Sequence, residues 1–164
     1  MGLRKADEKD ITLIQKLAQS SWRSAYPGII PVEQIEYMLK SMYSDDEICN
    51  HMKNSDFHYF IIENNKQEPI GFIGFEHYFE ADTTKLHRIY LTQDAIGHGF
   101  GKEAINLVKD HTLSTLNKRI ILNVNKYNPA LKVYQSQGFQ IIDEIVLDIG
   151  NGYVMDDYIM EYNF

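Results

Sequence analysis

The segment DAIGHGFGKEAI, residues 94–105, carries glycine at every second position: Gly97, Gly99 and Gly101. Because glycine has no Cβ, such a chain lets several backbone N–H groups approach one ligand closely. If a helix follows, these groups lie at its positive end, which favours anions. A diphosphate fits this arrangement best, and a turn that binds nothing is the alternative.

Two common phosphate-binding motifs do not fit the segment. A Walker A loop ending at Gly101-Lys102 would place Ile96 at its first glycine and Glu103 where a metal-binding hydroxyl is required. A dinucleotide fingerprint starting at Gly97 would need glycine or alanine at Lys102, and no acidic ribose partner follows at the required distance. A nucleotide-binding function is therefore the weaker alternative.

The elements that must position the segment follow from periodicity. A strand near Leu3 precedes a helix that Asp10 can cap, and two further helices, beginning near Pro31 and at Ser44, are expected over a cleft. Aromatic and β-branched runs then predict a hairpin, FHYFII with PIGFIGFEHYF, and a further strand, KLHRIYL.

The glycine segment follows that strand and opens a helix whose apolar face we expect to run from Ala104 to Leu116. The strand RIILNV comes next, then a helix with Asn128 as N-cap and Gly138 near its end. A second hairpin turns at GNG. We therefore predict an α/β protein of the α+β type, one domain over residues 1–164, in which helices flank a central twisted mixed sheet.

Two of these stretches, IYLTQDAIGHGFGKEAI and VNKYNPALKVYQSQGF, resemble the Gcn5-related N-acetyltransferase (GNAT) superfamily in order and spacing. The resemblance covers most of the chain. It implies the GNAT fold and acetyl transfer from acetyl-CoA to an amine by direct attack in a ternary complex. The first helix and the pattern GNGYVMDDYIM resemble the bacterial polyamine (spermidine/spermine) acetyltransferase branch.

The resemblance also implies which residues hold acetyl-CoA. Backbone amides of Ile89, Tyr90 and Leu91 would bind the pantetheine. The pyrophosphate would lie on the loop residues Ile96, Gly97, His98, Gly99, Phe100, Gly101 and Lys102. Ile96 stands where the family usually has Arg or Gln. Asn128, six rather than seven residues before Tyr134, contacts the cofactor or only caps its helix.

Acetyl transfer needs a proton donor and a proton acceptor. Tyr134 occupies the family's general-acid position, from which a phenol can protonate the departing thiolate. An alkylammonium, with a pKa near 10.4, must first lose a proton. His87 stands where many relatives carry a glutamate base, and strand alternation would place it on the face of Ile89 and Leu91. Glu76 and a water chain are the alternatives.

Charge and composition limit the partners. The net charge of −7 and the absence of a basic cluster argue against nucleic acid. Acidic residues of the two helices over the cleft either bind a cationic amine or only face solvent, and the same two interpretations apply to Asp156 and Asp157. Cys49 is the only cysteine and the histidines are scattered singly, so we expect no metal site.

No run approaches the ~18 apolar residues of a membrane span, and the charged start lacks a signal-peptide core. We therefore expect a cytoplasmic protein that has a small-molecule amine as partner and does not bind membranes, with a homodimer as a candidate assembly. Two alternatives stay open: a catalytically silent acyl-CoA-binding regulatory module, and an acetyltransferase that modifies a protein or peptide amine.

Overall fold

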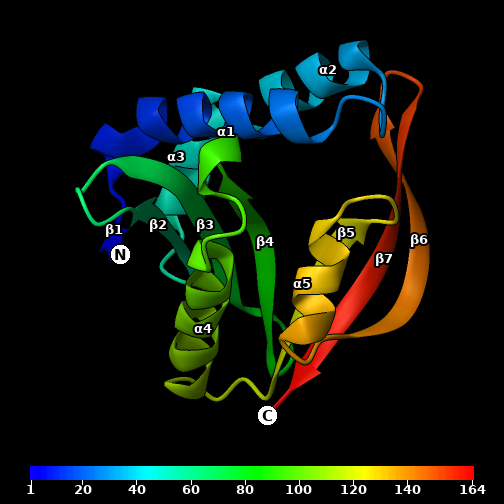
Figure 1. The fold of residues 1–164 in the computed structure, drawn as a ribbon. Coiled ribbons are helices and arrows are strands. Elements are labelled where there is room, and N and C mark those ends of the chain that lie inside the picture. Colours follow the sequence, from blue (N-terminus) through cyan, green and yellow to red (C-terminus); the bar gives the residue numbers. More distant parts are fainter.

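The computed structural model describes every residue from Met1 to Phe164. One sheet has the strand order β1-β2-β3-β4-β5-β7-β6 (Figure 1). Its strands are β1 (Gly2–Lys5), β2 (Phe57–Glu63), β3 (Pro69–Glu80), β4 (Thr83–Leu91), β5 (Arg119–Asn125), β6 (Gln140–Gly150) and β7 (Tyr153–Asn163). The helices are α1 (Ile11–Ala25), α2 (Val32–Met42), α3 (Asp45–Lys53), α4 (Phe100–Leu113) and α5 (Ala130–Ser136), and the short 3₁₀ turns are η1 (Glu8–Asp10) and η2 (Gln93–Ala95). The predicted mixed sheet flanked by helices is confirmed.

Helices cover both faces of the sheet, and each face has its own apolar core. On one face, Trp22 of α1, Ile35 of α2 and Ile48 of α3 pack against Phe72 of β3. On the other face, α4 and α5 pack against β3, β4 and β5 (Figure 1). No helix is both long and apolar enough to cross a membrane.

β4 and β5 separate in the middle of the sheet. Their parallel pairing extends only over residues 83–86 of β4 and 119–122 of β5. Beyond this point β5 continues to Asn125 alongside β7, whereas β4 continues to Leu91 alongside β3. The second half of β4 therefore has an unpaired backbone edge, and the gap between the strands has α4 on one side and α5 on the other (Figure 1).

A bulge in β4 changes the predicted direction of His87. Gly74 of β3 pairs with Arg88, but the next residue, Phe75, pairs with Leu86, so that His87 is the extra residue. Ile89 and Leu91 pack into the core under α4, whereas the His87 ring stacks on Phe57 at a centroid distance of 5.0 Å. The prediction that His87 shares the face of Ile89 and Leu91 is therefore wrong, because a bulge interrupts strict alternation.

Local signals near the helix ends were partly correct. Ser44 caps α3 by accepting a hydrogen bond from the Glu47 N–H at 3.2 Å. The Asp10 carboxylate does not cap α1; it accepts from Arg4 at 2.9 Å and from the Asp7 N–H. Leu116 lies beyond the end of α4 and is 78% exposed, so the predicted apolar face of this helix stops earlier.

Gly71 is a test of how tightly β3 and β4 fit. A Cβ at this position would lie 2.8 Å from Leu91 Cδ2 and would clash with the Tyr90 carbonyl oxygen. We expect Gly71→Ala to lower the free energy of unfolding by about 1–3 kcal/mol, because backbone must move to accept the methyl group. Urea denaturation measures the loss. Gly101→Ala is the control, since its Cβ would make an ordinary contact of 3.7 Å; equal stability of the two variants would contradict the account.

Candidate active site

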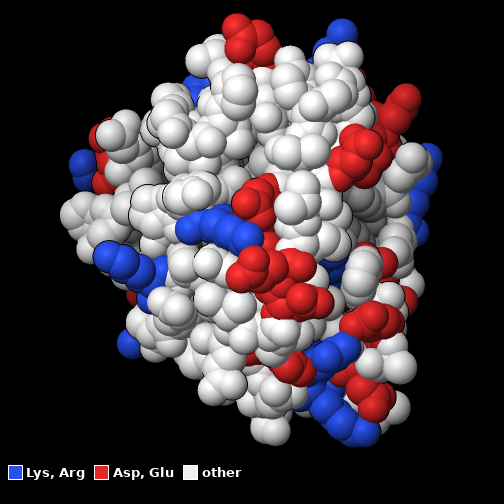
Figure 2. Space-filling model, turned by 90° about the vertical axis from the view of Figure 1, so that its right-hand side faces the viewer, with Lys and Arg blue, Asp and Glu red and all other residues white.

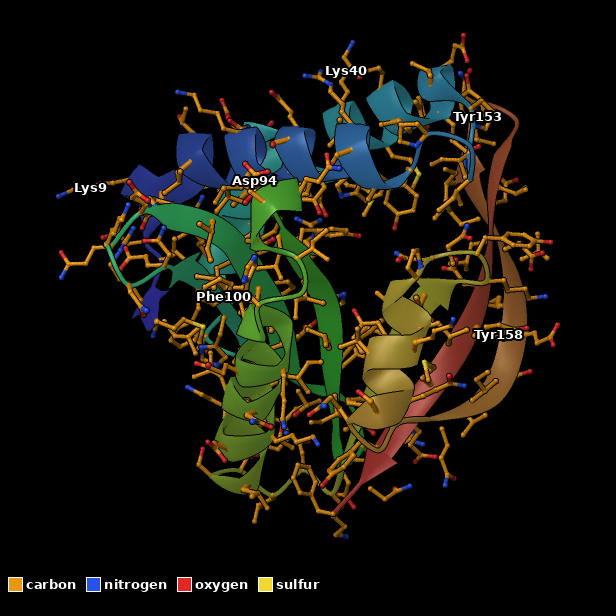
Figure 3. All side chains as sticks on the ribbon, in the orientation of Figure 1. Lys9, Lys40, Asp94, Phe100, Tyr153 and Tyr158 are labelled. Carbon is orange, nitrogen blue, oxygen red and sulfur yellow. The ribbon has the colours of Figure 1, made fainter.

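The glycine segment forms a loop and the first turn of α4, on the stretch between Asp94 and Phe100 that Figure 3 labels. Gly97 and Gly99 both have φ of 86°, in the left-handed region that favours glycine, and Gly99 is the N-cap of α4. The backbone N–H groups from Gly97 to Lys102 donate no hydrogen bond within the chain. They are therefore free donors at the positive end of a helix, which fits a diphosphate.

The side chains of this loop point outward. Ile96 is 58% exposed, and His98 and Lys102 are exposed as well. No side chain of the loop fills the space in front of its free backbone amides, which are thus the donors that the loop itself gathers.

The unpaired edge of β4 adjoins the loop. Alternate residues of His87 to Leu91 direct their N–H and C=O groups away from β3, toward the gap in which β5 no longer pairs with β4. A ligand with amide groups along an extended chain can pair with this edge as another strand would. The donor set thus fits the pantetheine arm expected at Ile89, Tyr90 and Leu91.

Tyr134 of α5 lies on the opposite side of the gap, in contact with Phe139 at a centroid distance of 5.9 Å. Burial raises its pKa well above the ordinary value for tyrosine. The phenol therefore stays protonated at neutral pH and is able to donate a proton.

Tyr26, at the end of α1, approaches the gap from the other face of the sheet. Its hydroxyl accepts from Asn128 Nδ2 at 3.5 Å, and burial raises its pKa together with that of Tyr90, its hydrogen-bond partner. Asn128 Oδ1 accepts from the Ala130 N–H at 2.9 Å. The N-cap of α5 is Pro129, so the Asn128 side chain caps the first turn from one residue before the predicted boundary, and a contact with the cofactor stays a prediction.

His87 and Glu76 are partners rather than alternatives. His87 Nε2 lies 2.9 Å from Glu76 Oε2, and burial with the nearby charges of Lys85 and Arg88 lowers the pKa of His87 to about 3. The ring is therefore neutral at pH 7, its Nε2–H donates to the carboxylate, and Nδ1 keeps a lone pair. A pKa this low argues against His87 as the direct base for an alkylammonium.

The two aspartates of β7 have different environments. Asp156 lies 3.0 Å from Lys126 Nζ in an ion pair. Asp157 is only 6% exposed, and its Oδ1 has no hydrogen-bond partner. Burial and the charge of Asp156 raise the pKa of Asp157 to about 6, although Lys85 opposes the shift. The sequence showed the pair but gave no sign that one carboxylate is buried.

Arg88 has a structural role that the sequence did not suggest. Its guanidinium donates to the Tyr59 hydroxyl and to the Met42 carbonyl, both at 2.7 Å, and lies 4.3 Å from the centroid of the Tyr43 ring. It thereby holds the bulge of β4 against α2 and β2. No motif marks such a residue, because its partners in α2 and β2 are distant from it in sequence.

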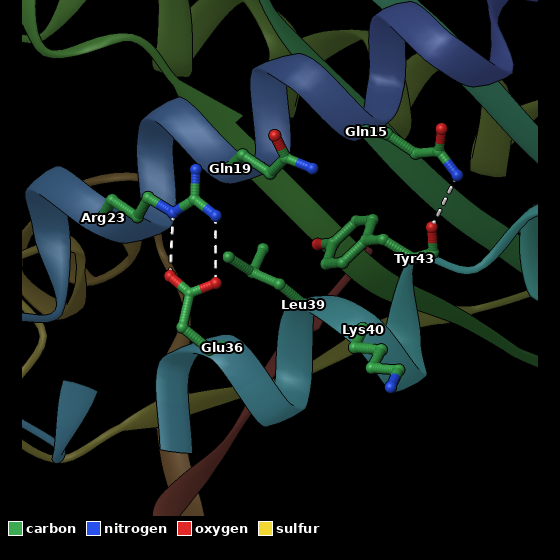
Figure 4. Close-up of a pocket in the computed structure, with 7 residues that line it drawn as sticks. All are labelled: Gln15, Gln19, Arg23, Glu36, Leu39, Lys40 and Tyr43. Carbon is green, nitrogen blue, oxygen red and sulfur yellow. Dashed lines mark hydrogen bonds and ion pairs between the residues drawn. The ribbon is translucent and has the colours of Figure 1, made fainter. Parts of the chain in front are cut away.

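The space between α1 and α2 is a separate pocket of about 300 Å³ (Figure 4). Arg23 donates to both oxygens of Glu36, at 2.8 and 2.9 Å, and Gln15 donates to the Tyr43 carbonyl at 2.9 Å. None of its lining residues comes from β4, the loop or α5. Glu36 is one of the acidic residues of the two helices that either bind a cationic amine or only face solvent, and the structure pairs it with Arg23.

Comparison with known proteins identifies the family of this chain. Residues 14–139 match the acetyltransferase (GNAT) family. Spermidine N(1)-acetyltransferase of Thermoplasma acidophilum is 26% identical over 147 residues, covering 86% of this chain and 89% of that protein.

Solved structures share the fold at lower identity. The PaiA N-acetyltransferase of Thermoplasma acidophilum, solved with coenzyme A, has a TM-score of 0.85 and 24% identity over 99% of this chain and 98% of its own. A chimera of the spermidine N-acetyltransferase SpeG from Vibrio cholerae and hSSAT has a TM-score of 0.73 and 22% identity, covering 99% and 96% of the two chains.

The chain belongs to the acetyltransferase (GNAT) family, because the match covers most of the chain and includes the glycine loop, the β4–β5 gap and all of α5. It is an N-acetyltransferase, and its acetyl donor is acetyl-CoA. No group of three or more His, Cys, Asp or Glu side chains is arranged to hold a metal ion.

The buried charge of Asp157 leads to a prediction about stability. Its pKa is about 6 in the folded chain against an ordinary 3.8, so the folded state holds the proton more tightly and loses stability as pH rises through this interval. We expect Asp157→Asn to be more stable than the parent by about 1–3 kcal/mol at pH 8, and by less at pH 5.

Urea denaturation at the two pH values measures this difference. Asp156→Asn is the matched control, because its carboxylate is partly exposed and paired with Lys126. An Asp157→Asn variant that is less stable than the parent at pH 8 would contradict the assignment of a buried, unpartnered charge.

Proposed function

We propose that the chain acetylates a primary amine by direct attack on acetyl-CoA in a ternary complex, and that the acceptor is a polycationic amine such as spermidine. The observation that carries the proposal is the β4–β5 gap, with unpaired backbone donors along one side and a protonated Tyr134 on the other. Such a gap takes an extended thioester from the α4–α5 face and an amine from the α1 face.

The loop from Ile96 to Lys102 would hold the pyrophosphate through its free N–H groups, and the edge of β4 from Ile89 to Leu91 would hold the pantetheine. When bound, acetyl-CoA supplies the thioester that the amine attacks. Tyr134 would donate its proton to the departing thiolate. His87, fixed by Glu76, would use the lone pair of Nδ1 to orient the amine or a water molecule.

A cationic acceptor is supported by charge and by relatives. The net charge is −7, and Figure 2 shows acidic side chains gathered over the middle of the face at the right of Figure 1. Relatives of similar length bear the name spermidine N-acetyltransferase. An acidic surface concentrates and orients a polycation and repels an anionic acceptor.

A panel of amines tests the proposal through thiol release from acetyl-CoA. We expect spermidine and spermine to react faster than neutral amines, acidic amines and lysine peptides, with a preference that falls at high salt as charges are screened. Equal rates for polyamines and neutral amines, with no effect of salt, would contradict a polyamine acceptor. Tight CoA binding without thiol release for any amine would favour the silent acyl-CoA-binding module.

Tyr134→Phe tests the general acid. We expect turnover to fall about 10²–10⁴-fold while CoA affinity stays nearly constant, because the hydroxyl acts only as the thiolate departs. Steady-state kinetics and calorimetric titration measure the two quantities. Tyr127→Phe is the control in the same segment, since Tyr127 is 74% exposed. Full turnover in Tyr134→Phe would show that another group is the acid.

Gly99→Ala tests the loop. Alanine is strained at φ of 86°, by about 1–3 kcal/mol, so we expect the loop to shift and the Kd for CoA to rise about tenfold. Gly28→Ala is a matched control, because Gly28 has φ of 83° and equally open surroundings but lies outside the loop. If both variants bind CoA as the parent does, the loop is not part of the cofactor site.

A further inference from the structure

We infer that Asp157 is the carboxylate that receives the ammonium group of the acceptor and takes its first proton. This role rests on the proposed transfer to a cationic amine and names the group on the chain that would recognise it. The sequence left open whether Asp156 and Asp157 bind a cationic amine or only face solvent; the inference for Asp157 comes from where the strand order places its side chain.

The register of β7 puts Asp157 at the wall of the gap. It pairs with Asn125, the last residue of β5, three positions after β5 has stopped pairing with β4 at Leu122. Met155, two residues earlier, packs into the core under α1–α3, so alternation directs Asp157 to that same face. This is the face of His87 and Tyr26, from which an amine would approach.

The carboxylate has no partner within the chain. Oδ1 is buried and accepts no hydrogen bond, and no Lys, Arg or His forms an ion pair with Asp157. A buried carboxylate without donors is costly, so its retention calls for a ligand that supplies them. An alkylammonium carries a positive charge and three N–H donors, which complement both the charge and the free oxygen.

None of the charged and titratable groups around Asp157 pairs with its carboxylate, so the carboxylate is free to receive an ammonium group. Tyr26 of α1 is kept protonated by burial. Lys85 Nζ of β4 lies over the Phe79 ring, 4.4 Å from its centroid, and burial lowers the pKa of this lysine. Asp156, next to it on β7, is held by Lys126. The raised pKa of Asp157, about 6, makes it a stronger base than an ordinary aspartate, and burial of the ammonium lowers the pKa of the amine toward it.

The proton balance is complete with these groups. The ammonium gives one proton to Asp157, which passes it to solvent. The nitrogen then forms a bond to the acetyl carbon as the carbon–sulfur bond breaks, and the sulfur takes the phenolic proton of Tyr134. The new amide nitrogen loses its second proton, which restores the phenol. The sum is R–NH₃⁺ and acetyl-CoA giving the N-acetylamine, CoA and one proton.

The test compares Asp157→Asn with Asp156→Asn on two acceptors: spermidine, which is cationic at pH 7, and an alkoxyamine, which is neutral. We expect Asp157→Asn to lower kcat/KM for spermidine about 10²-fold or more and to lower it only a few-fold for the alkoxyamine, which has no ammonium proton to give. In the parent, the acidic limb of kcat/KM for spermidine should fall near pH 6, and Asp157→Asn should lose that limb. Asp156→Asn should keep the parent's rates at pH 7, with its acidic limb moved to lower pH, because the charge of Asp156 helps to raise the pKa of Asp157.

Binding gives a readout apart from turnover. Calorimetric titration of the CoA-bound chain with spermidine should show affinity at least about tenfold weaker in Asp157→Asn than in Asp156→Asn, and CoA affinity unchanged in both, which also confirms that the variants are folded.

The outcomes are distinct. If the parent acetylates spermidine and Asp157→Asn matches Asp156→Asn in rate and binding, the role of Asp157 is overturned while the proposed function stands. An equal loss with both acceptors and an unchanged pH limb would make Asp157 a structural residue and would also overturn it. A parent that acetylates no cationic amine overturns the proposed function and this inference together.

Discussion

The separation of β4 from β5 after Leu86 and Leu122 is the constraint on which the site depends. A central strand that loses its neighbour exposes a row of backbone donors and acceptors that must find another partner. The bulge at His87 begins at this same point. The next residue, Arg88, fixes the bulge by donating hydrogen bonds to the Tyr59 hydroxyl and the Met42 carbonyl. The opened sheet is thus packed against other elements on both faces, and its free backbone groups are in place for a ligand.

Polar groups around the gap are costly to the folded state. Tyr26, Tyr90 and Tyr134 are buried phenols, and Asp157 is a buried carboxylate without a donor. Each would destabilise the core if the site served packing alone. Tyr26 and Tyr134 belong to the two apolar cores, but together with Tyr90 and Asp157 they lie at the place where the sheet opens. Such a concentration of buried polar groups is the pattern expected of a catalytic centre, where stability is lost in favour of function.

The sequence allowed the fold and the loop to be predicted because these depend on local signals. Glycine at positions 97 and 99, the Asn128 cap and the alternation of the hairpins each act within a few residues. The direction of His87 was not predictable, since the bulge that turns it arises from register with β3. The burial of Asp157, and the pairing of Glu36 with Arg23, likewise depend on elements distant in sequence. The sequence therefore allowed the type of chemical group at each position to be predicted, but not the burial and partners of that group in the fold.

The central claim is that unpaired amides of the glycine loop and of the β4 edge together form the acetyl-CoA site. Amide hydrogen exchange, measured residue by residue with and without CoA, tests it most directly. The account predicts that CoA slows exchange at Gly97 to Lys102 and at alternate residues of His87 to Leu91, while the amides that line the pocket between α1 and α2 stay unchanged. Protection confined to that pocket, with the loop and the β4 edge exchanging as freely as before, would contradict it.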